Sequence, residues 1–403
     1  MTRTEQRLRE AFAEGARTVR PETVRSLSLP RRRRRLSWPV PAISAAAVAL
    51  SVVLSVLVGG RAPTDPVTAG GGPAFLVATV GFGELPKGTS RVEVRDAQGR
   101  VYDQRSASHG LTFQYVAAAP DDRTFFVMEV PIRQTACNVI RLYRMKVAAT
   151  GKITAFTPLG ARVQGGTMRR EAMPGGLAAS PDGRRLAYAV LPCGVPSDRL
   201  YYKIGVVDLR TGAQREWTDP QESVVSSLSW TSDARQIVFL RREPTHARDD
   251  GFALPSRNGV VRMLDTASKS TDLRAGTVLL RQSRELRNIW AAVINGDGTR
   301  VTVVAEYSRS DGALSVCQVS IADGRVLRML HREGSESEAV SALPGVGAGV
   351  ALSSDASGRH LLYYDPSIAD TAPGFGGYGR IDDGRFRAIP VSDEDDEAYD
   401  LAW

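Results

Sequence analysis

One short pattern recurs along most of this 403-residue chain: a strand ends, a turn built around Asp and Gly follows, and a strongly apolar strand comes next. Five copies are present, at 117–128, 178–190, 229–240, 293–304 and 352–364, with turn aspartates Asp121, Asp182, Asp233, Asp297 and Asp355. An Asp side chain caps such a turn, and Gly supplies the positive φ that a tight hairpin needs. The aspartates are therefore predicted to be structural rather than catalytic, in a repeat of 51 to 64 residues.

Each copy continues with a third strand, a second turn and a fourth strand. The second turns are expected at 98–99, 150–151, 211–212, 266–267, 323–324 and 383–384. The first unit lacks an innermost strand, and the last five residues, YDLAW at 399–403, match SSLSW at 226–230 in pattern. Pairing this end with the first unit would close a ring without a covalent link. The prediction is an all-β, six-bladed β-propeller closed by its C-terminal strand.

The propeller is expected to occupy residues 74–403. Its blades are placed at 74–107 plus 397–403, 111–158, 173–218, 223–274, 286–332 and 346–390.

Residues 36–60 contain no charged side chain and are mostly Ala, Val, Leu, Ile and Ser. About 20 such residues span the apolar core of a bilayer as a helix. Five arginines precede this segment: Arg31, Arg32, Arg33, Arg34 and Arg35. By the positive-inside rule, we expect a single-pass signal-anchor in the plasma membrane, with residues 1–35 cytosolic and 61–403 extracytoplasmic. Residues 61–73 are expected to be a flexible linker.

Two other interpretations of residues 36–60 are a cleaved signal peptide and a buried core helix. A signal peptide would have a basic region of 35 residues, and no small-residue cleavage site follows the apolar run. A core helix seldom follows five adjacent arginines. The anchor is the favoured interpretation.

The positive charge of the chain is concentrated in its N-terminal tail. Residues 1–35 hold 11 Arg and 4 Glu, a net charge of +7 out of +8 for the whole chain. The remainder has no dense basic stripe, which argues against nucleic-acid binding. The tail is predicted to form one short helix, and it is either a solvated topology signal or a docking site for a cytosolic regulator.

The clearest turn unit, SPDGRRLAY at 180–188, resembles the repeat of the TolB-like, WD-repeat-like β-propellers. The copies at 231–239 and 353–363 are degenerate, and Asp121-Asp122 replaces Asp-Gly. The resemblance covers 74–403 and implies the same fold. With the basic tail and anchor, the chain also resembles membrane-anchored propeller proteins of GC-rich Gram-positive bacteria.

The candidate ligand-binding surface is the rim formed by the second-to-third-strand loops and the connections between blades. Its most polar segment, 241–258, is expected to be a loop, and loops on a rigid scaffold often carry binding residues. The candidate residues are Arg241, Arg242, His246, Arg248, Asp249 and Asp250. The alternative is a polar loop with no ligand.

Two of the three cysteines, Cys137 and Cys193, each follow the second strand of adjacent blades on the same rim. Because disulfides persist in exported domains, this pair is predicted to be bridged. Cys317, in a predicted third strand, is expected to be a buried thiol. The chain has no CxxC pair and only four scattered His, so neither a metal site nor a cofactor is predicted.

We expect a non-enzymatic binding, sensing or protein-interaction module held outside the membrane, with a protein or cell-envelope ligand and with signalling through the tail. One alternative is a lactonase- or glycosidase-like propeller hydrolase with carboxylates around the channel, but the expected innermost strands at 177–179, 228–230 and 290–292 are apolar. No G-x-S-x-G motif is present. Another alternative, a Tol-type envelope interaction protein, follows from family analogy alone.

Overall fold

The computed structural model describes residues 73–81, 90–132, 137–165, 175–195, 200–246, 253–308, 314–332, 350–355, 357–364, 378–389 and 397–403. The predicted tail and transmembrane helix, and the linker up to residue 72, lie outside these residues. Within the described part, no helix has the length and apolar character needed to span a membrane.

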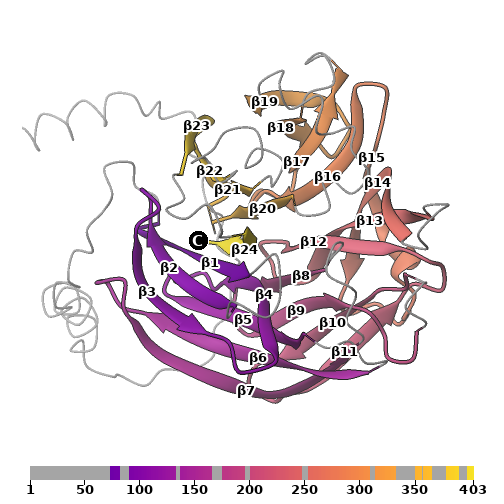
Figure 1. Cartoon of the computed structure of the whole chain (residues 1–403). Helices are drawn as coiled ribbons and strands as arrows, with labels where there is room; N and C mark the ends of the chain where they lie inside the picture. The colour runs from indigo at the N-terminus through magenta and orange to yellow at the C-terminus, as the bar shows by residue number, and fades with distance from the viewer. Residues whose placement is uncertain are drawn as a thin grey trace, which may run out of the picture. The chain divides into compact units, whose positions relative to one another are not determined.

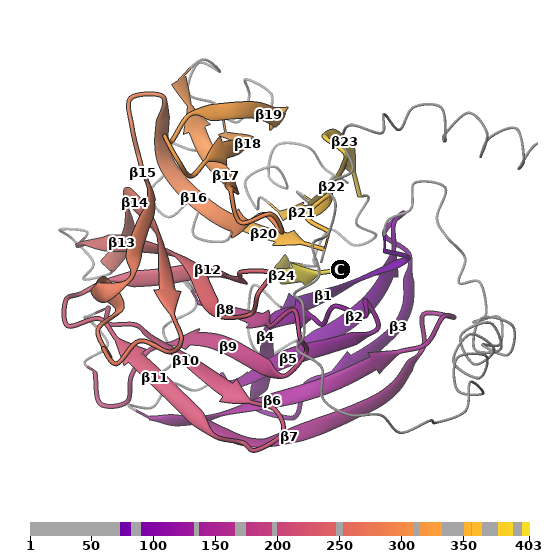
Figure 2. The same cartoon turned by 180° about the vertical axis from the view of Figure 1, so that it is seen from behind.

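The described chain forms six four-stranded antiparallel sheets, each one blade of a β-propeller (Figures 1 and 2). Blade 1 contains β24 (Glu397–Ala402), β1 (Phe75–Gly81), β2 (Arg91–Asp96) and β3 (Val101–Ser106). Blade 2 contains β4 (Leu111–Ala118), β5 (Thr124–Pro131), β6 (Asn138–Val147) and β7 (Ile153–Gly165). Blade 3 contains β8 (Gly176–Ala179), β9 (Arg185–Val190), β10 (Lys203–Asp208) and β11 (Gln214–Thr218).

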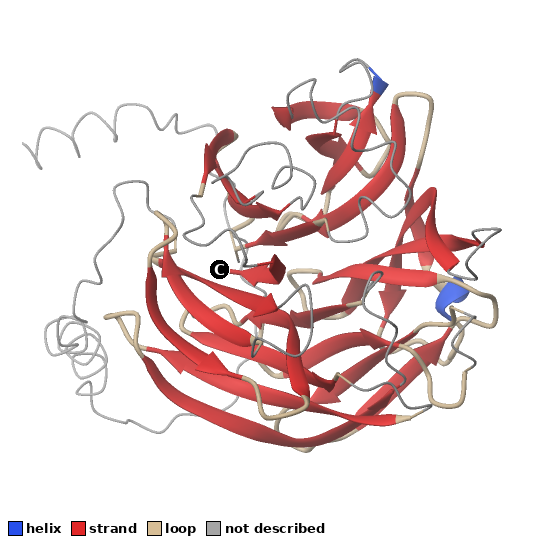
Figure 3. Ribbon diagram, viewed as in Figure 1, coloured by secondary structure: helices blue, strands red, loops and turns tan. Residues whose placement is uncertain are grey.

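Blade 4 contains β12 (Val224–Trp230), β13 (Gln236–His246), β14 (Ala253–Asp265) and β15 (Thr277–Arg281). Blade 5 contains β16 (Leu286–Ile294), β17 (Arg300–Tyr307), β18 (Leu314–Ser320) and β19 (Val326–Arg332). Blade 6 contains β20 (Ala351–Ser354), β21 (His360–Tyr364), β22 (Tyr378–Asp382) and β23 (Arg385–Ala388). A 3₁₀ turn, Leu273–Ala275, precedes β15, and strands make up most of the described part of the chain (Figure 3).

The C-terminal strand closes the ring. β24 pairs antiparallel with β1, with Ala402 opposite Val77 and Leu401 opposite Ala78. Leu401 and Trp403 are 2% and 1% exposed and pack in one apolar cluster with Leu76 of β1 and residues of blade 6. The predicted six-bladed, all-β propeller with C-terminal closure is confirmed.

Neighbouring blades pack through the faces of their sheets. Second strands of the blades contain long apolar runs, as in β5 (TFFVMEVP) and β9 (RLAYAV), because they are covered on both faces. The third strand of blade 2, β6, alternates buried and exposed residues over much of its length. Between blades 3 and 4, for example, Trp217 and Ile204 share an apolar cluster with Phe239. The innermost strands β24, β4, β8, β12, β16 and β20 therefore surround the centre of the ring.

The first turns have the predicted chemistry in four blades. Each turn aspartate accepts a hydrogen bond from the backbone N–H two residues ahead, at 3.1 Å for Asp121 and Asp182, 3.0 Å for Asp233 and 2.9 Å for Asp297. The residue after each aspartate has a φ between 50° and 68°, in the left-handed region. We call the rim that carries these turns, and the turns between third and fourth strands, the turn rim.

Asp355 takes a different place in its turn from the one that the repeat predicted. Its carboxylate accepts from the backbone N–H of His360 at 3.1 Å, as the Ser180 hydroxyl does from Arg185 at 2.9 Å. Ser357, which accepts from the N–H of Arg359 at 3.2 Å, then occupies the position of the other turn aspartates. The sequence SSDASGR contains two residues that can cap this turn, Asp355 and Ser357. The pairing of β20 with β21 places Ser357 at the capping position.

Candidate functional site

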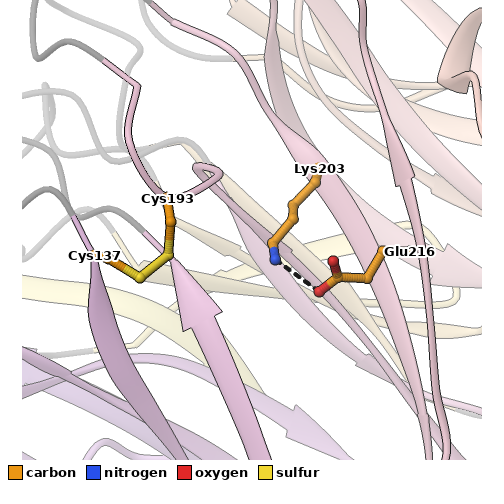
Figure 4. The surroundings of a disulfide bond; sticks show 4 residues. All are labelled: Cys137, Cys193, Lys203 and Glu216. Carbon is orange, nitrogen blue, oxygen red and sulfur yellow. Dashed lines mark hydrogen bonds and ion pairs between the residues drawn. A yellow bond between two sulfur atoms is a disulfide. The ribbon is translucent and has the colours of Figure 1, made fainter.

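The rim opposite the turn rim carries the connections between second and third strands, and we call it the loop rim. Here Cys137, immediately before β6, and Cys193, which follows β9, form a disulfide with a Cα–Cα distance of 4.5 Å (Figure 4). It is the pair that the sequence predicted, and it ties blade 2 to blade 3. Nearby in blade 3, the Lys203 ammonium and the Glu216 carboxylate form an ion pair at 2.7 Å. Cys317 is a buried free thiol in β18, and burial raises its pKa to about 12.

The polar segment of blade 4 forms a hairpin on the loop rim, where the sequence suggested a loop. β13 and β14 continue to pair at Pro244–Pro255, Thr245–Leu254 and His246–Ala253. The pairing of β12 with β13 reaches only Arg242, and that of β14 with β15 only Val260. Among the described strands, the tip of the hairpin therefore pairs with itself alone and extends beyond the four-stranded sheet (Figure 1).

This hairpin separates the six candidate rim residues. Arg241 and Arg242 are not loop residues but lie buried in β13. His246 is the last residue of β13, and only its backbone is described. Arg248, Asp249 and Asp250 lie outside the described residues. The physical reason for the difference is that backbone pairing, rather than an apolar core, continues the strands through the polar stretch.

Arg241 and Arg242 have opposite electrostatic surroundings, although they are neighbours. The Nε–H of Arg241 donates to Oδ2 of Asp219 at 2.5 Å, and Asp219 is 3% exposed. Arg242 is 2% exposed, and its guanidinium lies over the Trp290 ring at 5.6 Å from the ring centre. Its Nε and Nη1 have no hydrogen-bond partner among the described residues. Burial lowers the pKa of Arg242 to about 10, so the side chain is still cationic at neutral pH.

Arg242 lines a cavity of about 240 Å³ in the centre of the ring. All six blades contribute to its wall, mainly through their innermost strands. The apolar part of the wall includes Ala117, Leu177, Leu228, Val293 and Leu352. Because Arg242 pairs with Val224, the first residue of β12, it lies toward the loop-rim end of this channel.

Carboxyl groups lie farther along the channel. The Asp400 carboxylate accepts from the backbone N–H of Val116 at 3.0 Å, and burial raises its pKa to about 7. At the turn rim, burial and the carboxylates of Asp355 and Asp121 raise the pKa of Asp122 to about 6. Asp122, Asp355 and Asp400 all line the cavity, so the channel is cationic at one end and acidic elsewhere.

The fold can be compared with solved structures. TolB from Acinetobacter baumannii superposes with a TM-score of 0.52 at 16% sequence identity, over 91% of this chain and 74% of the TolB chain. A protein of unknown function from Bacteroides caccae gives a TM-score of 0.45 at 10% identity, over 82% of this chain and 98% of its own. The chain has the TolB-like propeller fold. No family model matches the sequence, and no curated protein matches it.

Within the described part of this TolB-like propeller, no group of three or more His, Cys, Asp or Glu residues is placed to hold a metal ion. Sequence reasoning missed Asp400 as a channel residue. One signal could have found it: in the match of 399–403 to 226–230, Asp400 takes the place of Ser227, which also lines the cavity.

Proposed function

We propose that the chain is a membrane-tethered, extracytoplasmic propeller that works as a non-enzymatic protein-interaction module, with the loop rim as its contact surface. The observation that carries the proposal is the β13–β14 hairpin, whose tip extends past its own sheet. A two-stranded tip offers unpaired backbone groups on its outer edges, and such edges can accept a strand from a partner.

The Cys137–Cys193 disulfide supports both parts of the proposal. It holds two adjacent blades together on the same rim as the hairpin, which keeps the surface rigid. Structural disulfides also persist in oxidising compartments and are rare in the cytosol. An extracytoplasmic propeller is consistent with the charge asymmetry around residues 36–60. In this proposal, residues 1–35 face the cytosol and contact a regulator there.

Site-specific photo-crosslinking in living cells tests the contact surface. A photoreactive amino acid placed at His246 or Ala253, on the hairpin tip, should give a crosslinked adduct with one discrete partner. The matched control is the same amino acid at Arg184 or Arg210, exposed residues in turns on the opposite rim. Equal adducts from both rims, or none from the hairpin, would contradict the proposed surface.

Reporter fusions test the orientation separately. Alkaline phosphatase fused after Trp403 should be active, because the reporter folds only outside the cytosol, and a fusion before Thr2 should be inactive. Replacing Arg31 to Arg35 with neutral residues should weaken this asymmetry. The reverse pattern of activity would refute the orientation and leave the crosslinking result unaffected.

A further inference from the structure

Arg242 is a buried cation for which the described residues offer no anionic partner. A long Arg side chain near a surface usually extends its head into water, but this one is 2% exposed. A buried charge without a counter-charge is costly, and neighbouring Arg241 shows the usual solution, an ion pair with Asp219. The ring of Trp290 interacts favourably with the guanidinium through its face. It cannot accept hydrogen bonds from the guanidinium N–H groups, because these point along the plane of the guanidinium and not toward the ring.

Two further hydrogen-bond donors are left without a partner beside Arg242. The hydroxyl of Ser226 and the indole N–H of Trp290 are both buried, and neither has a partner among the described residues. Register places them together: Arg242 pairs with Val224 and Leu240 with Ser226, so Arg242 and Ser226 project from the same face of blade 4. Arg242, Ser226 and Trp290 all line the central cavity. Guanidinium and indole groups donate only, and the Ser226 hydroxyl, which could accept, has no hydrogen-bond partner among the described residues, so no acceptor in the described part of the chain is engaged by these donors.

We propose that the loop-rim end of the central channel binds a small organic monocarboxylate. The carboxylate would form an ion pair with the guanidinium of Arg242 and accept from one of its two unpartnered nitrogens, Nε or Nη1, whose N–H groups point to different sides of the group. The Ser226 hydroxyl and the Trp290 indole N–H supply the remaining donors. This small-molecule site is separate from the partner surface on the hairpin and does not depend on it.

The rest of the channel restricts the ligand to one negative charge and an apolar body. Beyond Arg242, the wall includes the apolar side chains of Leu228, Val293 and Leu352. Asp400 lies beside this apolar stretch, at the level of Ser227, and Asp122 and Asp355 lie farther along, at the turn rim. These carboxyl groups would repel a second anionic group. A cavity of about 240 Å³ lies below the usual size of sites for drug-sized ligands, which indicates a small molecule.

Thermal unfolding of the purified full-length chain in non-ionic detergent tests the site. Sodium acetate, butyrate, hexanoate, succinate and phosphate are compared with sodium chloride at constant ionic strength. A ligand that binds only the folded state raises the melting temperature, and saturating hexanoate should raise it by about 3 to 5 °C. Hexanoate should exceed acetate, because the apolar wall contributes, and it should exceed succinate and phosphate, which carry extra charge.

Arg242→Met removes the charge but keeps an apolar side chain of similar length. The variant should fold with an unchanged or higher melting temperature in chloride and should lose the hexanoate shift. Arg380→Met is the matched control: Arg380 is also buried and stacked on a tryptophan, Trp403, but it is ion-paired with Asp382 at 2.6 Å. That variant should be less stable in chloride and should retain the shift.

Three results would overturn the site: no carboxylate shifts the wild-type melting temperature, Arg242→Met keeps the full shift, or phosphate exceeds hexanoate. If Arg242→Met fails to fold, Ser226→Ala decides the question, because it deletes only one hydroxyl. Calorimetric titration with hexanoate should then show affinity weakened about 5-fold or more, equivalent to one lost hydrogen bond. Unchanged affinity in Ser226→Ala would count against the site.

Discussion

His331 in β19 is an imidazole that the fold holds in its neutral form. Its ring stacks on Phe386 of the next blade at 3.7 Å between ring centres, and burial lowers its pKa to about 4 from the ordinary value of 6.5. Protonation at mildly acidic pH is therefore easier in the unfolded chain than in the folded one. The consequence is a loss of stability as pH falls from about 6.5 to 4.

His331→Phe should remove this loss while keeping an aromatic ring against Phe386. The free energy of unfolding of the wild type, relative to the variant, should fall by about 2 kcal/mol between pH 7 and pH 4.5. Urea denaturation at a series of pH values measures it. Because the free energy of the variant is subtracted from that of the wild type at each pH, the contributions of other titrating groups, such as Asp400, cancel. Parallel pH profiles for the two proteins would contradict the assignment.

Residues whose role is local could be predicted from the sequence, and residues whose role depends on the closed ring could not. The turn aspartates Asp182 and Asp233 cap the backbone two residues away, so the short pattern around them was enough. Arg242 and Asp400 line the channel only because strands from all six blades meet there. The polar run after Leu240 also resembled a loop, since a self-paired hairpin needs no apolar alternation.

At the scale of the hairpin turn, a substitution at Gly183 tests why glycine is needed there: for its backbone conformation or for close packing. Its φ is 65°, and a Cβ added there would meet nothing within 4 Å. Gly183→Ala should therefore cost only the left-handed strain, roughly 1 to 2 kcal/mol in chemical denaturation. Gly160 in β7 is the control, because its Cβ position is equally open and its φ is not positive. Gly160→Ala should change stability by less than about 0.5 kcal/mol; equal effects would rule out strain as the cause.

The Cys137–Cys193 disulfide links two blades across 56 residues of sequence. Removing it by the double substitution Cys137→Ser, Cys193→Ser should lower the free energy of unfolding by about 2 to 4 kcal/mol. A reducing agent should lower the melting temperature of the wild type and leave that of the double variant unchanged. Mass spectrometry of unreduced, alkylated protein supplies the direct check. Alkylation of both Cys137 and Cys193 would disprove the bridge in solution.

The turn residues predict how many strands there are and in which order, but they do not predict where the outer strands end. Turns set the order and number of strands, and the predicted number of six four-stranded blades is confirmed. Two fourth strands depart from the expected blade ends: β7 continues to Gly165 instead of 158, and β15, Thr277–Arg281, lies wholly beyond the expected end at 274. These outer strands are largely exposed, so they lack the apolar pattern that marks strand ends in the inner ones.

For the whole molecule, the number of blades depends on one non-covalent pairing. The incomplete first unit and the match of 399–403 to an innermost strand predicted it, because a propeller must close its ring and the first unit lacks an innermost strand. In the structure, β24 fills that edge and lies between β1 and blade 6, with Leu401 and Trp403 in the cluster that joins them. On the other side, Ala402 shares an apolar cluster with Phe113 and Val127 of blade 2, so closure stabilises two blade interfaces at once.

Deleting residues 399–403 should destabilise the full-length chain severely. The deletion exposes the inner edge of β1 and removes two side chains that are almost fully buried. Loss of the Trp403 side chain alone should cost about 3 to 5 kcal/mol, a large fraction of the stability of an ordinary domain. The truncated protein should aggregate or melt far below the wild type in a thermal scan. Trp403→Phe keeps β24 and most of the buried ring, so it should fold and lie between the two. If the truncated chain kept the wild-type melting temperature, closure by β24 would contribute nothing to the ring, and the first blade would have to be stable with three strands.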